Sequence, residues 1–215
     1  MGRLNEGIFG GFSGRVGNVV GSTWKDIHYI RSRPAKYNDA KTKSQVKQRS
    51  KFSVAMEFLR TITPFVRVGF QSRANGRMTA FNAAMSYNMR SAMKGDHQGA
   101  EMDYPRVLVA RGELSAATGV RVTAAKGELR ATWIANQQRG TRSDDIVMLL
   151  AYNPLKGKAI YDLNAGKRGD SEAVLSLPLG WAGDEIETYL AFKTADGSEV
   201  SDSVYTGRHK VRFEH

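Results

Sequence analysis

The sequence predicts an α+β protein in which an extended, glycine-rich arm and a helical hairpin precede an antiparallel β-sandwich. Three observations predict this class. Glycine and large apolar residues are interleaved in the arm, apolar residues then recur at helical spacing, and short alternating runs separated by turn residues follow from residue 106. The predicted parts are the arm at 1–37, a basic helical region at 38–105 and the sandwich at 106–215.

The arm combines glycines with large apolar side chains. It holds 7 of the chain's 22 glycines, which raise the entropic cost of ordering a backbone, whereas a flexible tail in solvent would be polar. From residue 19 to residue 33, β-branched and aromatic residues predict extended structure. The apolar residues predicted to mediate assembly are Ile8, Phe9, Phe12, Val16 and Trp24. Packing on a neighbouring subunit and packing on the arm's own domain both explain this composition.

Residues 38–95 have the spacing of two helices. Thr42 and Gln45 stand at capping-box spacing, and Thr63-Pro64 is typical of the start of a further short helix. Asn75-Gly76 predicts a turn, and Gly95 predicts the end of the last helix. The apolar stripe of the first long helix comprises Phe52, Ala55, Met56, Leu59 and Ile62. The stripe of the second comprises Met78, Phe81, Met85, Met89 and Ala92.

Almost all of the net charge of +11 belongs to the first half of the chain. Residues 1–105 hold 17 Lys and Arg against 7 Asp and Glu, and residues 106–215 hold 15 against 14. Such an asymmetry favours a polyanionic partner. The residues predicted to contact a polyanion are Arg31, Arg33, Lys36, Lys43, Lys47, Arg49 and Lys51. The lysines recur every fourth residue, on a face expected to differ from the apolar stripe, and a solvated helix face explains them equally.

From residue 106, apolar and polar residues follow the alternating pattern of short strands. Turn residues recur at intervals that are typical of a β-sandwich. We expect strands near residues 106–111, 119–124, 128–135, 145–152, 158–163, 172–178, 185–193 and 198–206. Asp144-Asp145, directly before the fourth of these, is interpreted as a loop pair.

Two resemblances follow from particular residues. The segment from about 118 to 207 resembles a fibronectin type III domain, because Trp133 and Tyr189 stand where such domains bury a tryptophan and a tyrosine, and residues 195–203 resemble their last hairpin. This resemblance implies a binding module or spacer. The run GRVGNVVGSTWK at 14–25, followed by Ile30-Arg31-Ser32-Arg33-Pro34, resembles the opening of an uncharacterised bacterial family, which implies no activity.

No catalytic or metal-binding motif stands out. The chain has no cysteine, and its histidines, at positions 28, 97, 209 and 215, lack the spacing of metal ligands. The first 21 residues contain no apolar run of signal-peptide length, and nowhere is a run long enough to span a bilayer. We therefore expect a soluble, non-enzymatic protein without cofactor or metal, synthesised in the cytoplasm and not inserted into a membrane.

The function expected from charge and architecture is structural. The first hypothesis is an assembly protein, homo-oligomeric or combined with other subunits of a virion or another large particle. The second is a protein that binds nucleic acid without sequence specificity, through phosphate contacts of the basic half. The third is an adhesion or protein-binding module that acts through the sandwich.

Overall fold

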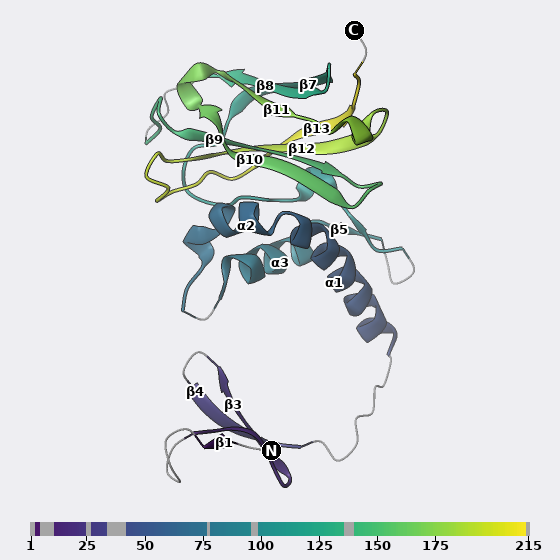
Figure 1. The fold of residues 1–215 in the computed structure, drawn as a ribbon, viewed down its shortest axis with the longest axis vertical. Helices are drawn as coiled ribbons and strands as arrows, with labels where there is room; N and C mark the ends of the chain where they lie inside the picture. The colour runs from purple at the N-terminus through teal and green to yellow at the C-terminus, as the bar shows by residue number, and fades with distance from the viewer. Residues whose placement is uncertain are drawn as a thin grey trace. The chain divides into compact units, whose positions relative to one another are not determined.

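The computed structural model describes residues 3–4, 11–24, 27–33, 42–76, 78–95, 99–135 and 140–213. The chain divides into two compact units, residues 1–42 and residues 43–215. Both are drawn in Figure 1, and each is described by itself. The predicted boundary near residue 37 lies close to the division, whereas the predicted boundary at 105–106 falls inside the second unit.

The first unit is an antiparallel sheet. Its strands β1 (Arg3–Leu4), β2 (Phe12–Val16), β3 (Val19–Trp24) and β4 (Ile27–Ser32) pair in the order β1-β2-β3-β4. Gly17 has a φ of +56° in the turn between β2 and β3, a conformation that favours glycine. The extended structure predicted from residue 19 to residue 33 is confirmed for the described residues.

The helices form one layer of the second unit. They are α1 (Lys43–Thr61), α2 (Thr63–Gly69) and α3 (Ala80–Ser91), with a short 3₁₀ turn, η1 (Gln71–Arg73), between the last two. Pro64 lies in the first turn of α2, as predicted. Thr79 caps α3 by accepting a hydrogen bond from the backbone N–H of Asn82 at 3.1 Å. The predicted helices are therefore confirmed, although Phe52 and Met78 of the predicted apolar stripes are exposed and Met78 precedes α3. A small hairpin, β5 (Met93–Lys94) and β6 (Glu101–Met102), and the turn η2 (Tyr104–Arg106) follow.

Two antiparallel sheets form the rest of the second unit. One has the order β11-β8-β7 and the other the order β10-β9-β12-β13, which confirms the predicted mixture of helices and antiparallel sheets. The strands are β7 (Thr118–Ala125), β8 (Glu128–Ile134), β9 (Ile146–Asn153), β10 (Lys158–Lys167), β11 (Glu172–Ser176), β12 (Glu185–Lys193) and β13 (Val204–Lys210). The 3₁₀ turns η3 (Arg168–Asp170) and η4 (Leu179–Trp181) flank β11.

Two of the predicted strands need correction. Residues 107–111 are not a strand, because their backbone groups bond outside any ladder: Leu108 N–H donates to Asn88 Oδ1 and Arg111 N–H donates to Gly69 O. The last strand begins at Val204, because residues 194–199 form a turn in which Asp196 accepts hydrogen bonds from Thr194 and Ser198.

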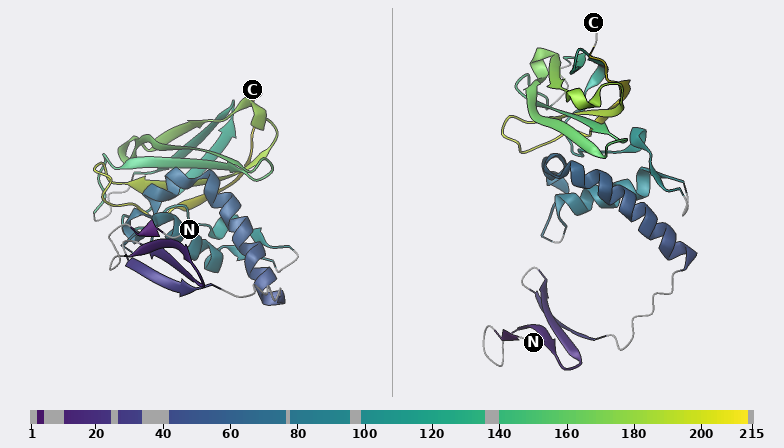
Figure 2. Two further views of the ribbon diagram at one scale, coloured as in Figure 1. Left: turned by 60° about the horizontal axis from the view of Figure 1, so that its bottom comes forward. Right: turned by 45° about the vertical axis from the view of Figure 1, so that its right-hand side comes forward.

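The four-stranded sheet β10-β9-β12-β13 is the middle of the three layers of the second unit. The helices cover one of its faces and the three-stranded sheet covers the other (Figures 1 and 2). Met148, Leu150 and Tyr189 belong to the core shared with the helices. Leu149, Phe192 and the other inward residues belong to the core between the two sheets. Helices and sheets therefore fold around one continuous middle sheet.

The two residues behind the fibronectin type III resemblance are both buried, as predicted, but they face different cores. Trp133 lies between the two sheets and contacts Phe192 edge to face. Tyr189 lies on the helix-facing side, where its hydroxyl donates to the backbone carbonyl of Tyr104 at 2.9 Å. The tyrosine thus joins the sandwich to the segment that follows the helices.

Candidate functional site

Strand register sorts the side chains of the first unit onto two faces. Residues directly opposite each other in an antiparallel pair share a face, and successive residues alternate. The pairs Val16↔Val19 and Gly21↔Ile30 define one face, and Arg15↔Val20↔Arg31 and Trp24↔Ile27 define the other. We call the first the Phe12 face (Phe12, Val16, Val19, Thr23, His28, Ile30) and the second the Arg31 face (Arg15, Val20, Trp24, Ile27, Tyr29, Arg31).

Both faces are open to solvent within this unit. Every residue of β4 is exposed. On the Phe12 face the exposed fraction is 53% for Val16 and 64% for Ile30, and on the Arg31 face it is 51% for Trp24 and 60% for Ile27. Large apolar side chains on both sides of one thin sheet have no core of their own to enter.

The predicted assembly residues do not form one surface. Phe12 and Val16 share the Phe12 face, whereas Trp24 lies on the opposite face with Arg31. The ring of Phe12 lies over Gly21, where an added Cβ would stand 2.6 Å from it, so Phe12 packs flat against the sheet. Ile8 and Phe9 lie outside the described residues.

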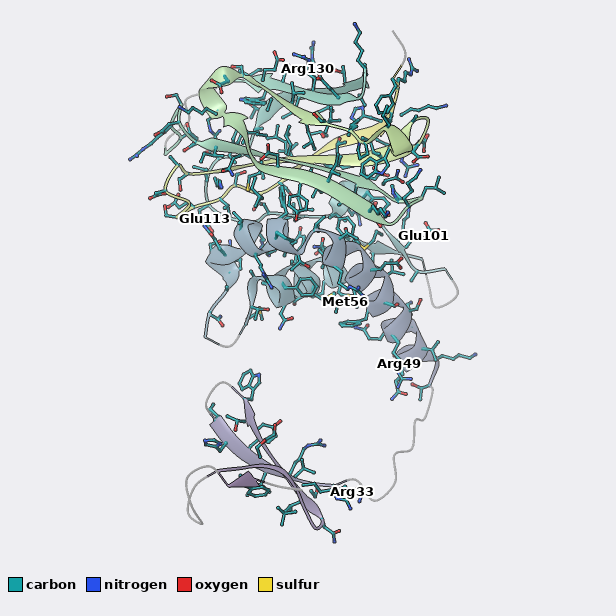
Figure 3. All side chains as sticks on the ribbon, viewed as in Figure 1. Arg33, Arg49, Met56, Glu101, Glu113 and Arg130 are labelled. Atoms are coloured by element: carbon teal, nitrogen blue, oxygen red, sulfur yellow. The ribbon has the colours of Figure 1, made fainter. Side chains whose placement is uncertain are left out.

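The predicted polyanion-binding residues are divided between the two units. Arg31 ends the Arg31 face and Arg33 follows β4, with its backbone N–H donating to Asn18 O at 2.8 Å. Lys36 lies outside the described residues. The remaining four are on α1: Lys43, Lys47, Arg49 and Lys51. Figure 3 labels Arg33 just after β4 and Arg49 near the start of α1.

Of the lysine row of α1, only Lys51 lies in line with the buried stripe of that helix. Each four-residue step turns about 40° around the helix axis, so Lys47 and Lys43 lie progressively farther from the stripe. Lys51 stands one turn before Ala55 and two turns before Phe58, both of which are buried. Residues 42–49 are all exposed, so the first turns of α1 extend beyond the core. The buried stripe therefore ends beside the partly buried Lys51, and Lys43 and Lys47 lie on the exposed turns before it.

The start of α1 is also electrostatically unusual. Its first turn holds Lys43 and no acidic residue. The unpaired N–H groups of a helix N-terminus carry partial positive charge, which favours anions there and disfavours lysine. The like charges of Lys43, Lys47 and Lys51 at four-residue spacing add a small further cost. An anion bound beside this segment would relieve both effects.

Sequence reasoning missed a charged pair in the interior of the sandwich. Arg168 Nε donates to Asp145 Oδ2 at 2.9 Å, and the side chains are 3% and 0% exposed. The guanidinium lies 3.7 Å from the centre of the Phe192 ring, and the indole N–H of Trp133 donates to the backbone carbonyl of Arg168. Burial lowers the pKa of Arg168 and the nearby Asp145 opposes that shift. Asp145 lies in the loop before β9, as predicted, and is also the interior ion-pair partner of Arg168.

A second buried network lies at the edge of the helix-facing core. Glu187 is 1% exposed and accepts hydrogen bonds from the Tyr205 hydroxyl at 2.6 Å and from Arg208 Nε at 2.8 Å. Burial, and secondly the hydrogen bond to Glu187, raises the pKa of Tyr205. Burial likewise raises the pKa of Tyr104, Tyr152 and Tyr189. These tyrosines hold the middle sheet and its neighbours together in their neutral form.

The described residues contain no group of three or more His, Asp or Glu side chains arranged to hold a metal ion. No helix in the described part of the chain is long and apolar enough to cross a membrane. A hollow beside α1 is lined by Ser53, Met56, Glu57, Arg60, Thr61 and Gly157; Met56 is labelled in Figure 3. The titratable groups of this lining are one carboxylate and one guanidinium, both on the same helix.

Comparison with known proteins gives one match over most of the chain. A family model described as a family of unknown function (DUF6266) matches residues 11–207. A search of curated proteins finds no match. Among solved structures, the fn3 domain of the human collagen alpha-1(XX) chain is 15% identical with a TM-score of 0.32, covering 47% of this chain and 88% of that one. A myokine structure is 13% identical with a TM-score of 0.34, covering 46% and 99%.

Proposed function

The chain belongs to the DUF6266 family of unknown function, and from this premise we propose that it is a non-enzymatic structural subunit that assembles with other copies of itself through the first unit. The observation that carries the proposal is the open sheet of residues 11–33. It forms a compact unit of its own, yet its large apolar side chains remain exposed on both faces.

The energetics favour a covered sheet. A small sheet gains stability when its exposed apolar face is packed against another surface. Full burial of a valine or isoleucine side chain contributes roughly 1.5–3 kcal/mol, and Val16, Val19 and Ile30 are all available on the Phe12 face. Docking on a preformed partner gains this burial without ordering a second flexible segment.

A second copy of the chain suits the Phe12 face because that face is nearly uncharged. Apart from His28, its residues are apolar, glycine or hydroxyl-bearing, so two copies can meet without like-charge repulsion. The Arg31 face carries Arg15 and Arg31, and two copies of it would repel. The proposed contact is thus a two-fold pairing of Phe12 faces, in which each subunit presents the same patch.

Within this proposal the second unit is the body of the subunit. We propose that its two-sheet part is a fibronectin type III-like sandwich that acts as a spacer, with the helices fixed to one face. Such a subunit would be made in the cytoplasm and incorporated into a large particle, such as a virion. Neither the spacer nor the particle requires a catalytic site.

The proposal is tested by measuring the molecular mass of the protein in solution. Full-length protein at high concentration should form dimers or larger assemblies by light scattering, and Val16→Asp combined with Ile30→Asp should give monomers that remain folded by circular dichroism. Leu155→Asp is the matched control, because Leu155 is an exposed apolar residue of the second unit, 80% exposed. If the full-length protein is monomeric, or if the double variant assembles as well as the control, assembly through the Phe12 face is wrong.

A second candidate function rests on α1. The lysine row at the exposed start of the helix, with no acidic residue in the first turn, suits non-specific contact with the phosphates of a nucleic acid. Lys43 and Lys47 are exposed and Lys51 is partly exposed, so the row is accessible without any rearrangement of the second unit.

A further inference from the structure

The Arg31 face has a composition that assembly does not explain. Arg15, Val20 and Arg31 lie side by side in one row across β2, β3 and β4. Tyr29 and Trp24 lie in the next two rows, on adjacent strands. Diagonal neighbours of this kind are about 7–8 Å apart, within mutual reach of aromatic side chains. One side of the sheet therefore presents two arginines at one end and two aromatic rings beyond them.

The charge of this surface is uniform. Residues 11–24 and 27–33 contain Arg15, Arg31 and Arg33 and no aspartate or glutamate. Arg15 and Arg31 are exposed, and the exposed fractions of Trp24 and Tyr29 are 51% and 43%. The guanidinium groups therefore have no acidic neighbour within these strands and can engage anions from outside.

Exposed aromatic rings beside arginines on an open sheet are the means by which proteins hold single-stranded nucleic acids. Bases stack on the rings, whatever their identity, while the cations contact the phosphates. A duplex does not suit such a face, because its bases are already stacked on one another. An apolar protein partner would use the rings but leave two arginines desolvated and unpaired.

We propose that the Arg31 face binds single-stranded nucleic acid, with bases stacked on Trp24 and Tyr29 and phosphates held by Arg15 and Arg31. This site is distinct from the proposed function, which uses the opposite side of the sheet, so either can fail without the other. It also differs from phosphate contact through α1, because it requires unpaired bases.

Tryptophan fluorescence reports this site directly. Of the three tryptophans, Trp133 and Trp181 are 5% and 4% exposed, whereas Trp24 is half exposed. Full-length protein is titrated with oligo-dT and with oligo-rU of about 15 nucleotides, at the upper end of common site sizes. The two strands distinguish DNA from RNA as the source of the ligand. Binding should quench the fluorescence of Trp24 in parallel with the rise in anisotropy of a labelled strand.

Two variants separate stacking from charge. Trp24→Leu with Tyr29→Leu keeps apolar bulk on the strands but removes both ring planes, and should raise Kd by about tenfold or more. Arg15→Gln with Arg31→Gln should lower the salt dependence of log Kd by roughly the slope of two phosphate contacts. Leu155→Ala with Leu179→Ala changes two exposed apolar residues of the second unit, is the matched control and should leave Kd unchanged.

Several results would overturn the proposal. The first is binding that does not quench the fluorescence of Trp24. The second is equal affinity for a duplex of the same length. The third is a Kd that neither double variant changes. Loss of binding on changing only Lys43, Lys47 and Lys51 to Gln would move the contact to α1. If iodide fails to quench Trp24 in the concentrated protein but quenches it on dilution, a second copy covers the Arg31 face and the nucleic-acid assignment is wrong.

Discussion

Arg168 and Asp145 form an ion pair in the interior of the sandwich. The distance from Arg168 Nε to Asp145 Oδ2 is 2.9 Å, and neither side chain is more than 3% exposed. Among the described residues, Asp145 Oδ1 and Arg168 Nη1 form no further hydrogen bond. A buried pair with incomplete hydrogen bonding contributes little net stability, although removing one member leaves the other charged and uncompensated.

This pair makes a sharp prediction for single and double variants. Asp145→Leu alone should lower the free energy of unfolding by about 3–5 kcal/mol, because the Arg168 cation stays in the interior. Asp145→Leu with Arg168→Met should recover part of that loss, since both charges are gone. Urea unfolding measures both. Glu113→Ala is the control, because it breaks an exposed pair with Arg73 that is worth at most about 1 kcal/mol; a loss from Asp145→Leu no larger than the control's would contradict the prediction.

The buried tyrosines predict sensitivity to alkali. Burial raises the pKa of Tyr104, Tyr152 and Tyr189 above the ordinary value of 10.0. The unfolded chain therefore releases these protons at a lower pH than the folded chain does, so stability is fully present below about pH 10 and is lost as the pH rises further. Urea midpoints measured from pH 8 to pH 11 should fall only above the ordinary tyrosine range.

The shared middle sheet predicts that residues 43–215 unfold together. Met148, Leu150 and Tyr189 are buried against the helices, so residues 106–215 alone would expose an apolar sheet face. We expect a fragment of residues 43–215 to show one thermal transition by circular dichroism and by tryptophan fluorescence. A fragment of residues 106–215 should be far less stable or should aggregate. Two separate transitions in the longer fragment would instead support the boundary predicted near residue 105.

The burial of Trp133 predicts that this residue contributes strongly to the stability of the core between the two sheets. Its ring is buried against Phe192 and its indole N–H is bonded to Arg168 O. Trp133→Ala should therefore lower the free energy of unfolding by roughly 3–5 kcal/mol. Trp24→Ala removes an exposed tryptophan of the other unit and should not shift the transition of residues 43–215. Equal effects of the two changes on that transition would show that Trp133 is not a core residue.

The lysine row of α1 predicts a charge effect without a stability cost. If Lys43, Lys47 and Lys51 contact phosphates, changing all three to glutamine should lower the salt slope of nucleic-acid binding by roughly the equivalent of three contacts. The unfolding midpoint should hold or rise slightly, because like charges at four-residue spacing are removed. Changing Arg121 of β7, Lys126 of the following turn and Arg130 of β8 to glutamine removes the same charge elsewhere. If both triple variants lowered the salt slope of binding equally, the lysine row would contribute only through the net charge of the protein.

Local pattern was sufficient for most of the elements, because helical spacing and strand alternation depend on neighbours in the sequence. The helices at residues 43–61 and 80–91 and six of the predicted strands follow directly from it. Residues 107–111 do not follow this rule, because their run of apolar residues packs between the helices and the sheet and joins no strand ladder. The unbroken apolar run from Ile146 to Tyr152 did carry a signal of burial on both faces, which the sandwich interpretation overlooked.

For the candidate sites, the sequence by itself determined which residues are present: an apolar, glycine-rich arm with arginines, and a helix that begins with a row of lysines. Only the tertiary structure decided how they are grouped. Strand register put Trp24 on the same face as Arg31 and on the opposite face from Phe12 and Val16, because a strand sends successive side chains to opposite faces and its partner's alignment decides which residues share one. Long-range packing likewise brought Asp145 to Arg168, a pairing that no local pattern encodes.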